Sequence, residues 1–154
     1  MTLRWLLALL HLLALGIGLG AVWARSNALR TVAARTDPAA LRRALGADAW
    51  WGAAAFVWLS TGLWRLFGAT EKATAYYMES PLFWTKMALF ALIFALEVWP
   101  IVTLTRWRRR LATGATPDTG AAGAIARIGV LQAILVVAMV AAATGMARGY
   151  GAGR

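Results

Sequence analysis

Three ionisable side chains that stand inside long apolar stretches are the residues of this chain best placed to do chemistry. They are His11, Lys86 and Glu97. An ionisable group inside a membrane span costs about 2.5 to 3.5 kcal/mol on insertion scales, so each one predicts either a function or a buried partner. A neutral imidazole can give a lone pair to a metal. An ammonium can neutralise an anion, and a carboxylate can carry a proton or pair with a cation.

His11 is the single histidine of the chain and the leading candidate ligand. Gly18 lies two turns further along the same helical face and removes side-chain bulk, which would make room for a flat cofactor such as haem b. Lys86 is expected at a similar depth on another helix, as a second ligand or as the partner of a propionate. The alternative is that His11 hydrogen-bonds a neighbouring helix and that Gly18 permits close packing. Both interpretations stay open at this point.

Glu97 is expected to need a partner, because it lies about two turns from the inner end of its apolar stretch and cannot reach water. Arg127, at the inner end of the last apolar stretch, is the expected partner in a buried ion pair. The alternative is that Glu97 is a proton-carrying carboxylate. No residue is assigned a catalytic role.

Residue counts exclude several kinds of site. The chain has no cysteine, which excludes disulfides, iron–sulfur clusters and thiolate nucleophiles. One histidine excludes any site that needs two imidazoles in one chain. The five methionines lie on separate segments without a metal-binding spacing, so they are expected to fill the core rather than to bind copper.

Membrane-spanning helices must position these side chains. Of the 154 residues, 61% are hydrophobic and 14% are charged, whereas a soluble domain has about 25% charged residues. A helix needs about 20 apolar residues to cross the hydrocarbon core of a bilayer. Four stretches qualify, at about 5–24, 49–67, 82–105 and 124–147. The sequence therefore predicts an all-α, single-domain protein of residues 1–154, folded as an antiparallel four-helix transmembrane bundle.

The connection between the first two stretches is predicted to hold a short amphipathic helix at the cytoplasmic surface. Asp37-Pro38 would cap this helix and Gly46 would end it. Leu41 and Leu45 would form its apolar stripe along the membrane. Asp48 is then the expected N-cap of the second span.

Small residues mark two helix faces on which other helices can pack. The first stretch resembles a signal peptide in its small residues near position 24, but its length and basic flank favour a retained helix. Gly16 and Gly20 form a GxxxG motif on this helix, and Ala138, Ala142 and Gly145 repeat at helical spacing on the last one. The expected partners are other membrane subunits or a second copy of the chain.

The basic residues predict the orientation in the membrane. Ten of the sixteen lie in or beside the first and third connections: Arg25, Arg30, Arg35, Arg42, Arg43, Arg106, Arg108, Arg109, Arg110 and Arg127. The positive-inside rule places these connections in the cytoplasm and both termini outside. Anionic lipid explains the positive charge better than nucleic acid does. Attraction to anionic headgroups contributes about 1 kcal/mol for each basic residue near the surface. The expected headgroup contacts are Arg42, Arg43, Arg106, Arg108, Arg109 and Arg110.

Four features together resemble an uncharacterised bacterial family of four-helix membrane proteins, a domain of unknown function. They are His11, the run WLSTGLWRLFG at 58–68, FWTKMALF at 83–90 and PIVTLTRWRRR at 100–110. More distantly, a histidine on the first helix and a lysine early in the third are similar to the membrane-bound protoporphyrinogen oxidases and the copper-resistance D-like proteins. The oxidase resemblance implies haem binding at His11 and Lys86, and the bacterial resemblance implies the inner membrane.

Two classes of function follow from these observations. The first is a non-catalytic accessory or structural subunit of a larger membrane complex, favoured because one histidine and few buried polar groups leave little material for chemistry. The second is a b-type haem protein, with an oxidoreductase activity like that of the oxidase family. An absorption spectrum of the purified protein separates the two classes.

Topology can be tested with a reporter that is active only in the cytoplasm. Since ten basic residues lie on one side, we expect activity when the reporter is inserted near Thr113 and none when it follows Arg154. The reverse pattern of activity would overturn the predicted orientation.

Overall fold

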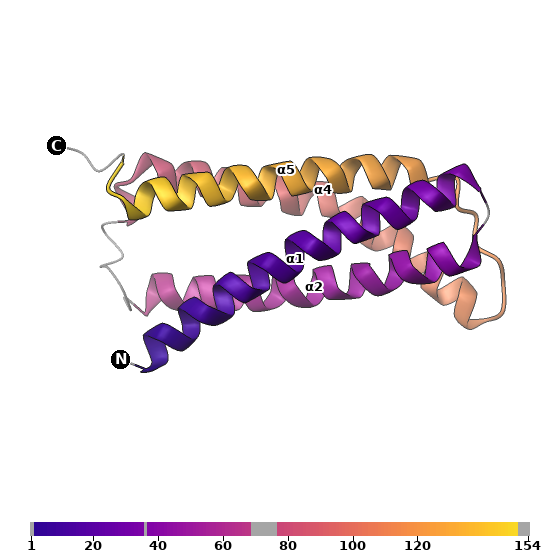
Figure 1. Ribbon diagram of the computed structural model, residues 1–154, viewed down its shortest axis with the longest axis horizontal. Helices are drawn as coiled ribbons and strands as arrows, with labels where there is room; N and C mark the ends of the chain where they lie inside the picture. The colour runs from indigo at the N-terminus through magenta and orange to yellow at the C-terminus, as the bar shows by residue number, and fades with distance from the viewer. Residues whose placement is uncertain (1, 36, 69–76, 151–154) are drawn as a thin grey trace.

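The computed structural model describes residues 2–35, 37–68 and 77–150 of the chain. Four long helices make up most of this part: α1 (Thr2–Ala34), α2 (Pro38–Phe67), α4 (Pro81–Ala112) and α5 (Ala122–Ala147). Figure 1 shows them lying along one common direction, with both ends of the chain at the same end of the molecule. The expected all-α class is confirmed.

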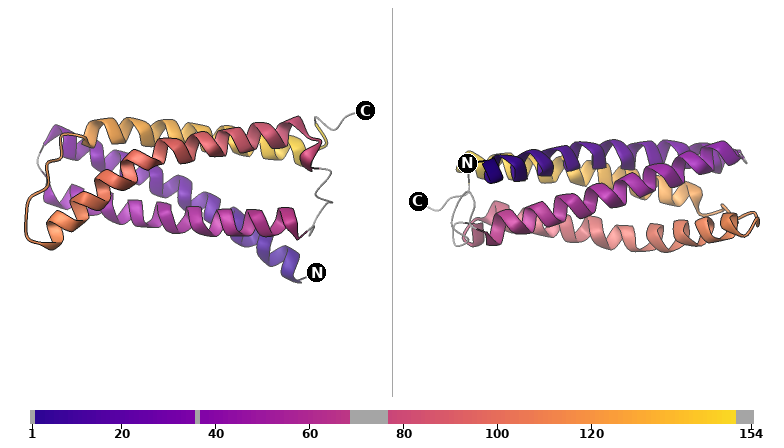
Figure 2. Two further views of the ribbon diagram at one scale, coloured as in Figure 1. Left: turned by 180° about the vertical axis from the view of Figure 1, so that it is seen from behind. Right: turned by 90° about the horizontal axis from the view of Figure 1, so that it is seen from below.

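Each helix packs on its neighbours in an oblique arrangement. The extensive contacts are between α1 and α2, between α1 and α5, and between α4 and α5. In Figure 1, α1 crosses α2, and the C-terminal end of α1 lies beside the start of α5. The left view of Figure 2 shows α4 running from the C-terminal end of α5 toward the beginning of α2. Consequently α2 and α4 approach each other at one end and separate toward the other.

The predicted amphipathic helix of the first connection does not exist as a separate element. The helix α1 continues to Ala34, and α2 begins at Pro38 and runs through Gly46 without a break. Leu41 and Leu45 are buried against α1 and α4, so their stripe contacts protein and not the membrane surface. The helical spacing of the two leucines was predicted correctly. The apolar stripe that they form belongs to the first turns of a 30-residue helix.

The cap of α2 is the one predicted at Asp37. Its carboxylate accepts hydrogen bonds from the backbone N–H groups of Ala39 and Ala40 at 2.8 and 3.0 Å. These bonds, that of Ala40 first, lower the pKa of Asp37, and the charge of nearby Arg43 acts in the same direction. Asp48 was expected to be a cap and is not one, because it lies inside α2, where its carboxylate is buried.

Two apolar clusters form the interior. One lies where α1 ends and α2 begins, and it is built around Leu29, Leu45, Leu104, Trp107 and Ile125. The other lies further along the bundle, and it contains Val22, Trp51, Ile93, Val136 and Met139. Polar side chains that α1, α2, α4 and α5 all contribute lie between the two clusters.

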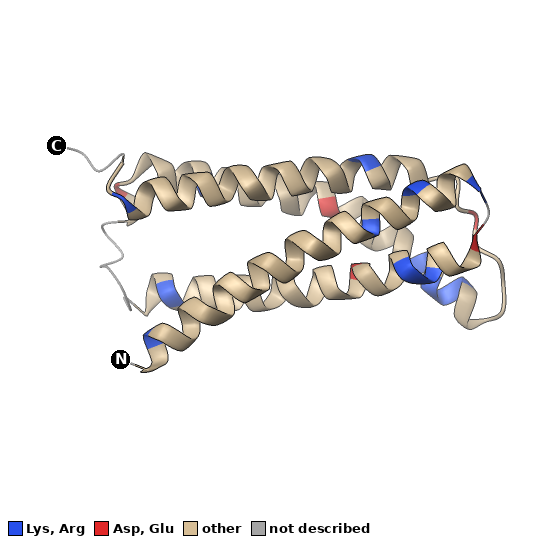
Figure 3. Ribbon diagram, in the orientation of Figure 1, with Lys and Arg blue, Asp and Glu red and all other residues tan. Residues whose placement is uncertain are grey.

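The outer surface of the helices suits a membrane. The helices α1, α4 and α5 are long and apolar enough to cross one. Large apolar side chains project outward, as with Phe56 at 73% exposure and Phe94 at 63%. Figure 3 shows charged positions gathered mainly toward the two ends of the molecule. The fourth helix, α2, is not among these three candidate spans.

Candidate functional site

Arg25 is the centre of a buried polar cluster. Its side chain has no exposed surface. The Nη1 group donates hydrogen bonds to Asp48 Oδ1 at 2.8 Å and to Glu97 Oε1 at 2.5 Å. The Nη2 group donates to Glu97 Oε2 and to Gln132 Oε1, both at 2.9 Å. One guanidinium from α1 therefore binds acceptors on α2, α4 and α5.

Gln132 closes the cluster from α5. Its amide nitrogen donates to Glu97 Oε2 at 2.7 Å and to the carbonyl of Ile93 at 3.2 Å. The Glu97 carboxylate thus accepts three hydrogen bonds, one at Oε1 and two at Oε2. A carboxylate has about four acceptor positions, so one lone pair of Oε1 is left over.

A second arginine balances the charge of the cluster. Arg108 Nη2 donates to Asp48 Oδ2 at 2.7 Å and to the carbonyl of Leu45 at 2.6 Å. Two arginines then face two carboxylates, and the cluster as a whole is neutral. Burial of charged groups is tolerated when they are paired and hydrogen-bonded in this way. The Nε group of Arg25 is buried and has no hydrogen-bond partner among the described residues.

The expected ion pair between Glu97 and Arg127 is not formed. Arg127 is exposed, whereas the buried Glu97 is held by Arg25 and Gln132. Positions 127 and 132 are five residues apart, which turns them to different faces of α5. Gln132, and not Arg127, is therefore the residue of α5 that contacts Glu97.

Sequence analysis missed Arg25, Asp48 and Gln132 as site residues. The signal for Arg25 was present, because it continues the buried stripe of Gly18, Val22 and Leu29 at helical spacing. An arginine within an apolar helical stripe indicates a buried partner. It was instead counted among the cytoplasmic charges, because it directly follows the apolar stretch.

His11 lies in a second cluster, around Trp58. The imidazole is buried and stacks on the indole, with ring centroids 5.0 Å apart and planes at 23°. Lys86 Nζ lies 5.5 Å from the centroid of the same indole, in a cation–π contact. The structure thus brings the two predicted cofactor ligands together, and each of them contacts the tryptophan.

His11 forms a hydrogen bond with Thr61 of α2. Thr61 Oγ1 lies 2.9 Å from His11 Nδ1, and it also lies 2.7 Å from the carbonyl of Val57. When the hydroxyl donates its one hydrogen to that carbonyl, it accepts from the Nδ1–H of His11. The lone pair of the imidazole is then on Nε2. This geometry agrees with the packing alternative, in which His11 bonds a neighbouring helix.

The described residues around His11 leave no space for haem. Trp51 and Ala54 fill the volume beside Gly18, since a Cβ there would contact both at 3.4 Å. Gly62 closes against the imidazole on the other side, where a Cβ would lie 3.2 Å from Cε1. The neighbouring cavity has a volume of about 90 Å³. A cavity of about 150 Å³ holds one benzene ring, so a porphyrin does not fit these residues.

The small-residue faces have different surroundings. Gly16 and Gly20 are exposed, and no described atom would lie within 4 Å of a Cβ at either. Ala142 is buried, and a Cβ on Gly145 would lie 3.3 Å from Leu82 of α4. The face of α5 is therefore used within the chain, apart from the exposed Ala138. The face of α1 is left bare by the described residues.

Most of the arginines expected at lipid headgroups are exposed. Five have this position: Arg42, Arg43, Arg106, Arg109 and Arg110. Arg108 departs from the expectation, because its guanidinium is turned inward to Asp48. It therefore belongs to the buried cluster.

Apolar helices of spanning length around a neutral buried polar cluster define a multi-helix membrane protein. A family model described as "Predicted membrane protein (DUF2214)" matches residues 3–151. The chain belongs to this family. No curated protein and no solved structure matches it, so nothing found supports the more distant resemblance to protoporphyrinogen oxidases or copper-resistance proteins.

The assignment of Glu97 to Arg25 can be tested by paired substitutions. Glu97→Gln removes one charge of a buried pair, and we expect the free energy of unfolding to fall by about 3 kcal/mol. Arg127→Gln changes an exposed side chain and should alter it by less than about 0.5 kcal/mol. Unfolding in mixed detergent measures both values. Equal losses for the two variants would contradict the observed pairing.

The packing role of His11 makes a separate prediction. His11→Gln should lower stability by about 1 kcal/mol through the altered bond to Thr61, because interhelical hydrogen bonds in membranes contribute about this much. Protein expressed with added haem should have no Soret band, and the variant should have the same spectrum. A Soret band that disappears in His11→Gln would contradict the packing role.

Proposed function

We propose that this protein is a non-catalytic, multi-pass subunit of the bacterial inner membrane, and that it works by associating with another membrane protein through α1. The docking face is the strip of α1 that carries Gly16 and Gly20. The first and third connections lie in the cytoplasm and both termini lie outside. The partner contributes a transmembrane helix, from another subunit or from a second copy of the chain.

The observation that carries this proposal is the bare GxxxG strip. Apart from each glycine's own neighbours and the nearby backbone of α1, no described atom lies within 4 Å of where a Cβ of Gly16 or Gly20 would be. Two adjacent side chains, Leu13 and Ile17, are 51% and 47% exposed. Helices in membranes associate where small residues let two backbones approach closely. A partner helix can therefore lie in the shallow channel that the glycines leave between larger neighbours.

The buried polar groups support a non-catalytic role. Arg25, Asp48, Glu97 and Gln132 bind one another across the helices. A general acid, base or nucleophile needs a titratable group that reaches a substrate. These four side chains are engaged in holding the helices together instead.

A transmembrane position for α2 is part of the proposal. From Ala49 onward, α2 has Arg65 as its one charged residue. Three of its large apolar side chains point away from the protein: Phe56, Leu63 and Trp64. A helix packed on α1 with such an outer surface is more stable in lipid than in water. The exposed arginines Arg42, Arg43, Arg106, Arg109 and Arg110 would then meet anionic headgroups at the cytoplasmic side.

Site-specific photocrosslinking in membranes tests the docking face. A photoreactive amino acid at position 17 lies between the two glycines, and one at position 56 replaces the exposed Phe56 on α2. We expect a protein adduct from position 17 and none from position 56. Gly16→Leu should abolish the adduct at position 17, because the added side chain fills the channel.

Gly52→Leu is the matched control for that substitution. Gly52 is also an exposed helical glycine, and no described atom lies within 4 Å of the place that a Cβ would take, but it belongs to α2. The adduct at position 17 should survive this change. Absence of any protein adduct at position 17 in the unsubstituted chain would refute the proposal. Ala142→Leu is unsuitable as a test, because Ala142 is buried within the chain.

A further inference from the structure

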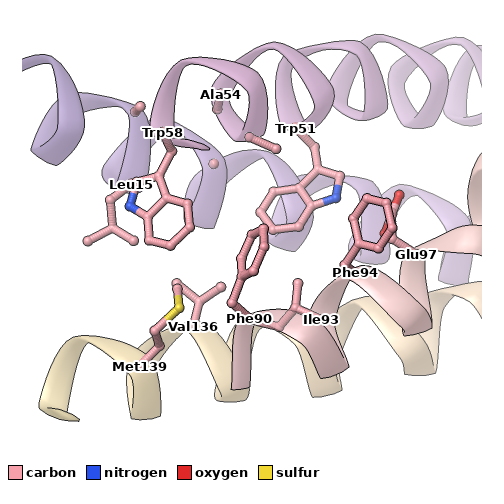
Figure 4. A pocket seen from close by; sticks show the side chains of 13 residues that line it. Leu15, Trp51, Ala54, Trp58, Phe90, Ile93, Phe94, Glu97, Val136 and Met139 are labelled. Carbon is pink, nitrogen blue, oxygen red and sulfur yellow. The ribbon is translucent and has the colours of Figure 1, made fainter. Parts of the chain in front are cut away.

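A groove between the end of α1 and the start of α5 differs in chemistry from the cavity of Figure 4. That cavity lies between the four helices, has a volume of about 90 Å³ and is walled mainly by apolar and aromatic side chains. The groove is larger, at about 460 Å³, it is open to the outside, and more of its surface is polar than apolar. Figure 1 shows the two helix ends that form it side by side.

The polar surface of the groove comes from few groups. Most of its lining residues are alanine, glycine or valine, which have no polar side-chain atom. The polar side chains that line it belong to Arg35, which directly follows α1, to Arg127 of α5, and to Thr119 shortly before α5. The two helices are in contact here, since a Cβ on Gly123 would lie 3.5 Å from that of Ala33. This contact brings arginines from two separate segments to one groove.

No described carboxylate lines the groove. Both arginines are exposed, and within the described part of the chain no hydrogen bond or ion pair engages either guanidinium. Asp37 is near Arg35, but its carboxylate caps α2 and lies 3.8 Å from Arg43. The carboxylate of Asp118 accepts a hydrogen bond from the N–H of Gly120 at 3.0 Å. The two guanidinium groups are therefore available to an anion from outside the chain.

We propose that this groove binds a glycerol-linked phosphate monoester, the group that phosphatidic acid carries in a membrane and that glycerol 3-phosphate carries in solution. A phosphate monoester has a charge of about −1.5 to −2 at pH 7, which matches the two arginines. The planar guanidinium forms paired N–H···O bonds to phosphate oxygens. The hydroxyl of Thr119, which has no hydrogen bond within the described chain, supplies a further donor.

The size of the groove suits such a group. A water molecule takes up about 30 Å³ of the liquid, so the groove has room for about 15 groups of that size. A glycerophosphate group has roughly ten non-hydrogen atoms and fits within this volume. Because the groove is open, acyl chains attached to the glycerol can extend out of it.

This site is separate from the docking face proposed above. Gly16 and Gly20 lie in the middle of α1, whereas Arg35 follows its last residue, Ala34. The site also differs from the general attraction of exposed arginines to anionic headgroups, because it requires two particular arginines and binds one ligand per chain. Either proposal can therefore fail without the other.

Isothermal titration calorimetry of the purified protein in a non-ionic detergent tests the proposal. The probes are dihexanoyl phosphatidic acid, a monoester, and dihexanoyl phosphatidylglycerol, a diester with a single negative charge. Titration into detergent without protein supplies the blank. We expect one phosphatidic acid per chain, bound about tenfold more tightly than phosphatidylglycerol, because the second charge strengthens the hydrogen bonds from arginine. Equal affinities for the two lipids would overturn the proposed match of charge.

Arginine substitutions locate the bound phosphate. Arg35→Gln and Arg127→Gln should each weaken the binding of phosphatidic acid at least about tenfold, because each removes charge-assisted hydrogen bonds. Arg109→Gln is the matched control, since Arg109 is an exposed arginine that does not line the groove and its loss lowers the net charge equally. It should change the affinity by less than about threefold. Unchanged affinity in both groove variants would overturn the proposal. The comparison of the two lipids uses the unsubstituted protein and does not depend on the folding of any variant.

Glycerol 3-phosphate distinguishes the two sources of the phosphate group. Binding at least about tenfold weaker than that of phosphatidic acid identifies the ligand as a lipid, because the acyl chains then contribute to the affinity. Similar affinities for both compounds, lost in Arg35→Gln and Arg127→Gln, identify a soluble phosphate ester. Either result supports the groove as the binding site. Absence of saturable binding by both compounds would refute it.

Discussion

The buried guanidinium of Arg25 is the constraint on which the arrangement of the helices depends. A buried charge needs hydrogen-bond partners, and acceptors on α2, α4 and α5 accept four hydrogen bonds from the two terminal nitrogens of this side chain. Each acceptor must lie at the position along its helix that is level with this guanidinium. The cluster therefore fixes the register of all four helices at a single level, which apolar packing alone does less strictly. Arg108 pairs with Asp48 and so balances the second carboxylate of the cluster.

This polar layer also divides the molecule into regions with different roles. On one side the last turns of α1 and α4 and the first turns of α2 and α5 enclose an apolar cluster. On the other side the helices separate enough to leave an aromatic cavity next to Glu97. The charged groups of the layer hold the helices together, and the exposed Gly16 and Gly20 of α1 lie outside it.

Helix identity and position could be predicted well from hydropathy, because runs of apolar residues are a local property. The helix ends were harder to predict. The short helix expected around Leu41 and Leu45 has the correct periodicity, but Gly46 and Asp48 do not interrupt α2 because tertiary contacts of α1 and α4 support it there. The partner of Glu97 could not be derived from one sequence, since it depends on how α1 and α5 rotate about their axes. Proximity of His11 and Lys86 was expected, whereas the indole of Trp58 between them followed only from packing.

A double-mutant cycle between Arg25 and Glu97 tests the central claim most directly. Arg25→Met, Glu97→Leu and the double variant are unfolded under one set of conditions, and the coupling free energy is obtained from the three changes. Direct pairing predicts a coupling of about 2 kcal/mol or more, with the double variant far more stable than the sum of the single losses implies. Additive losses, with a coupling below about 0.5 kcal/mol, would show that the two side chains are independent and would contradict this account.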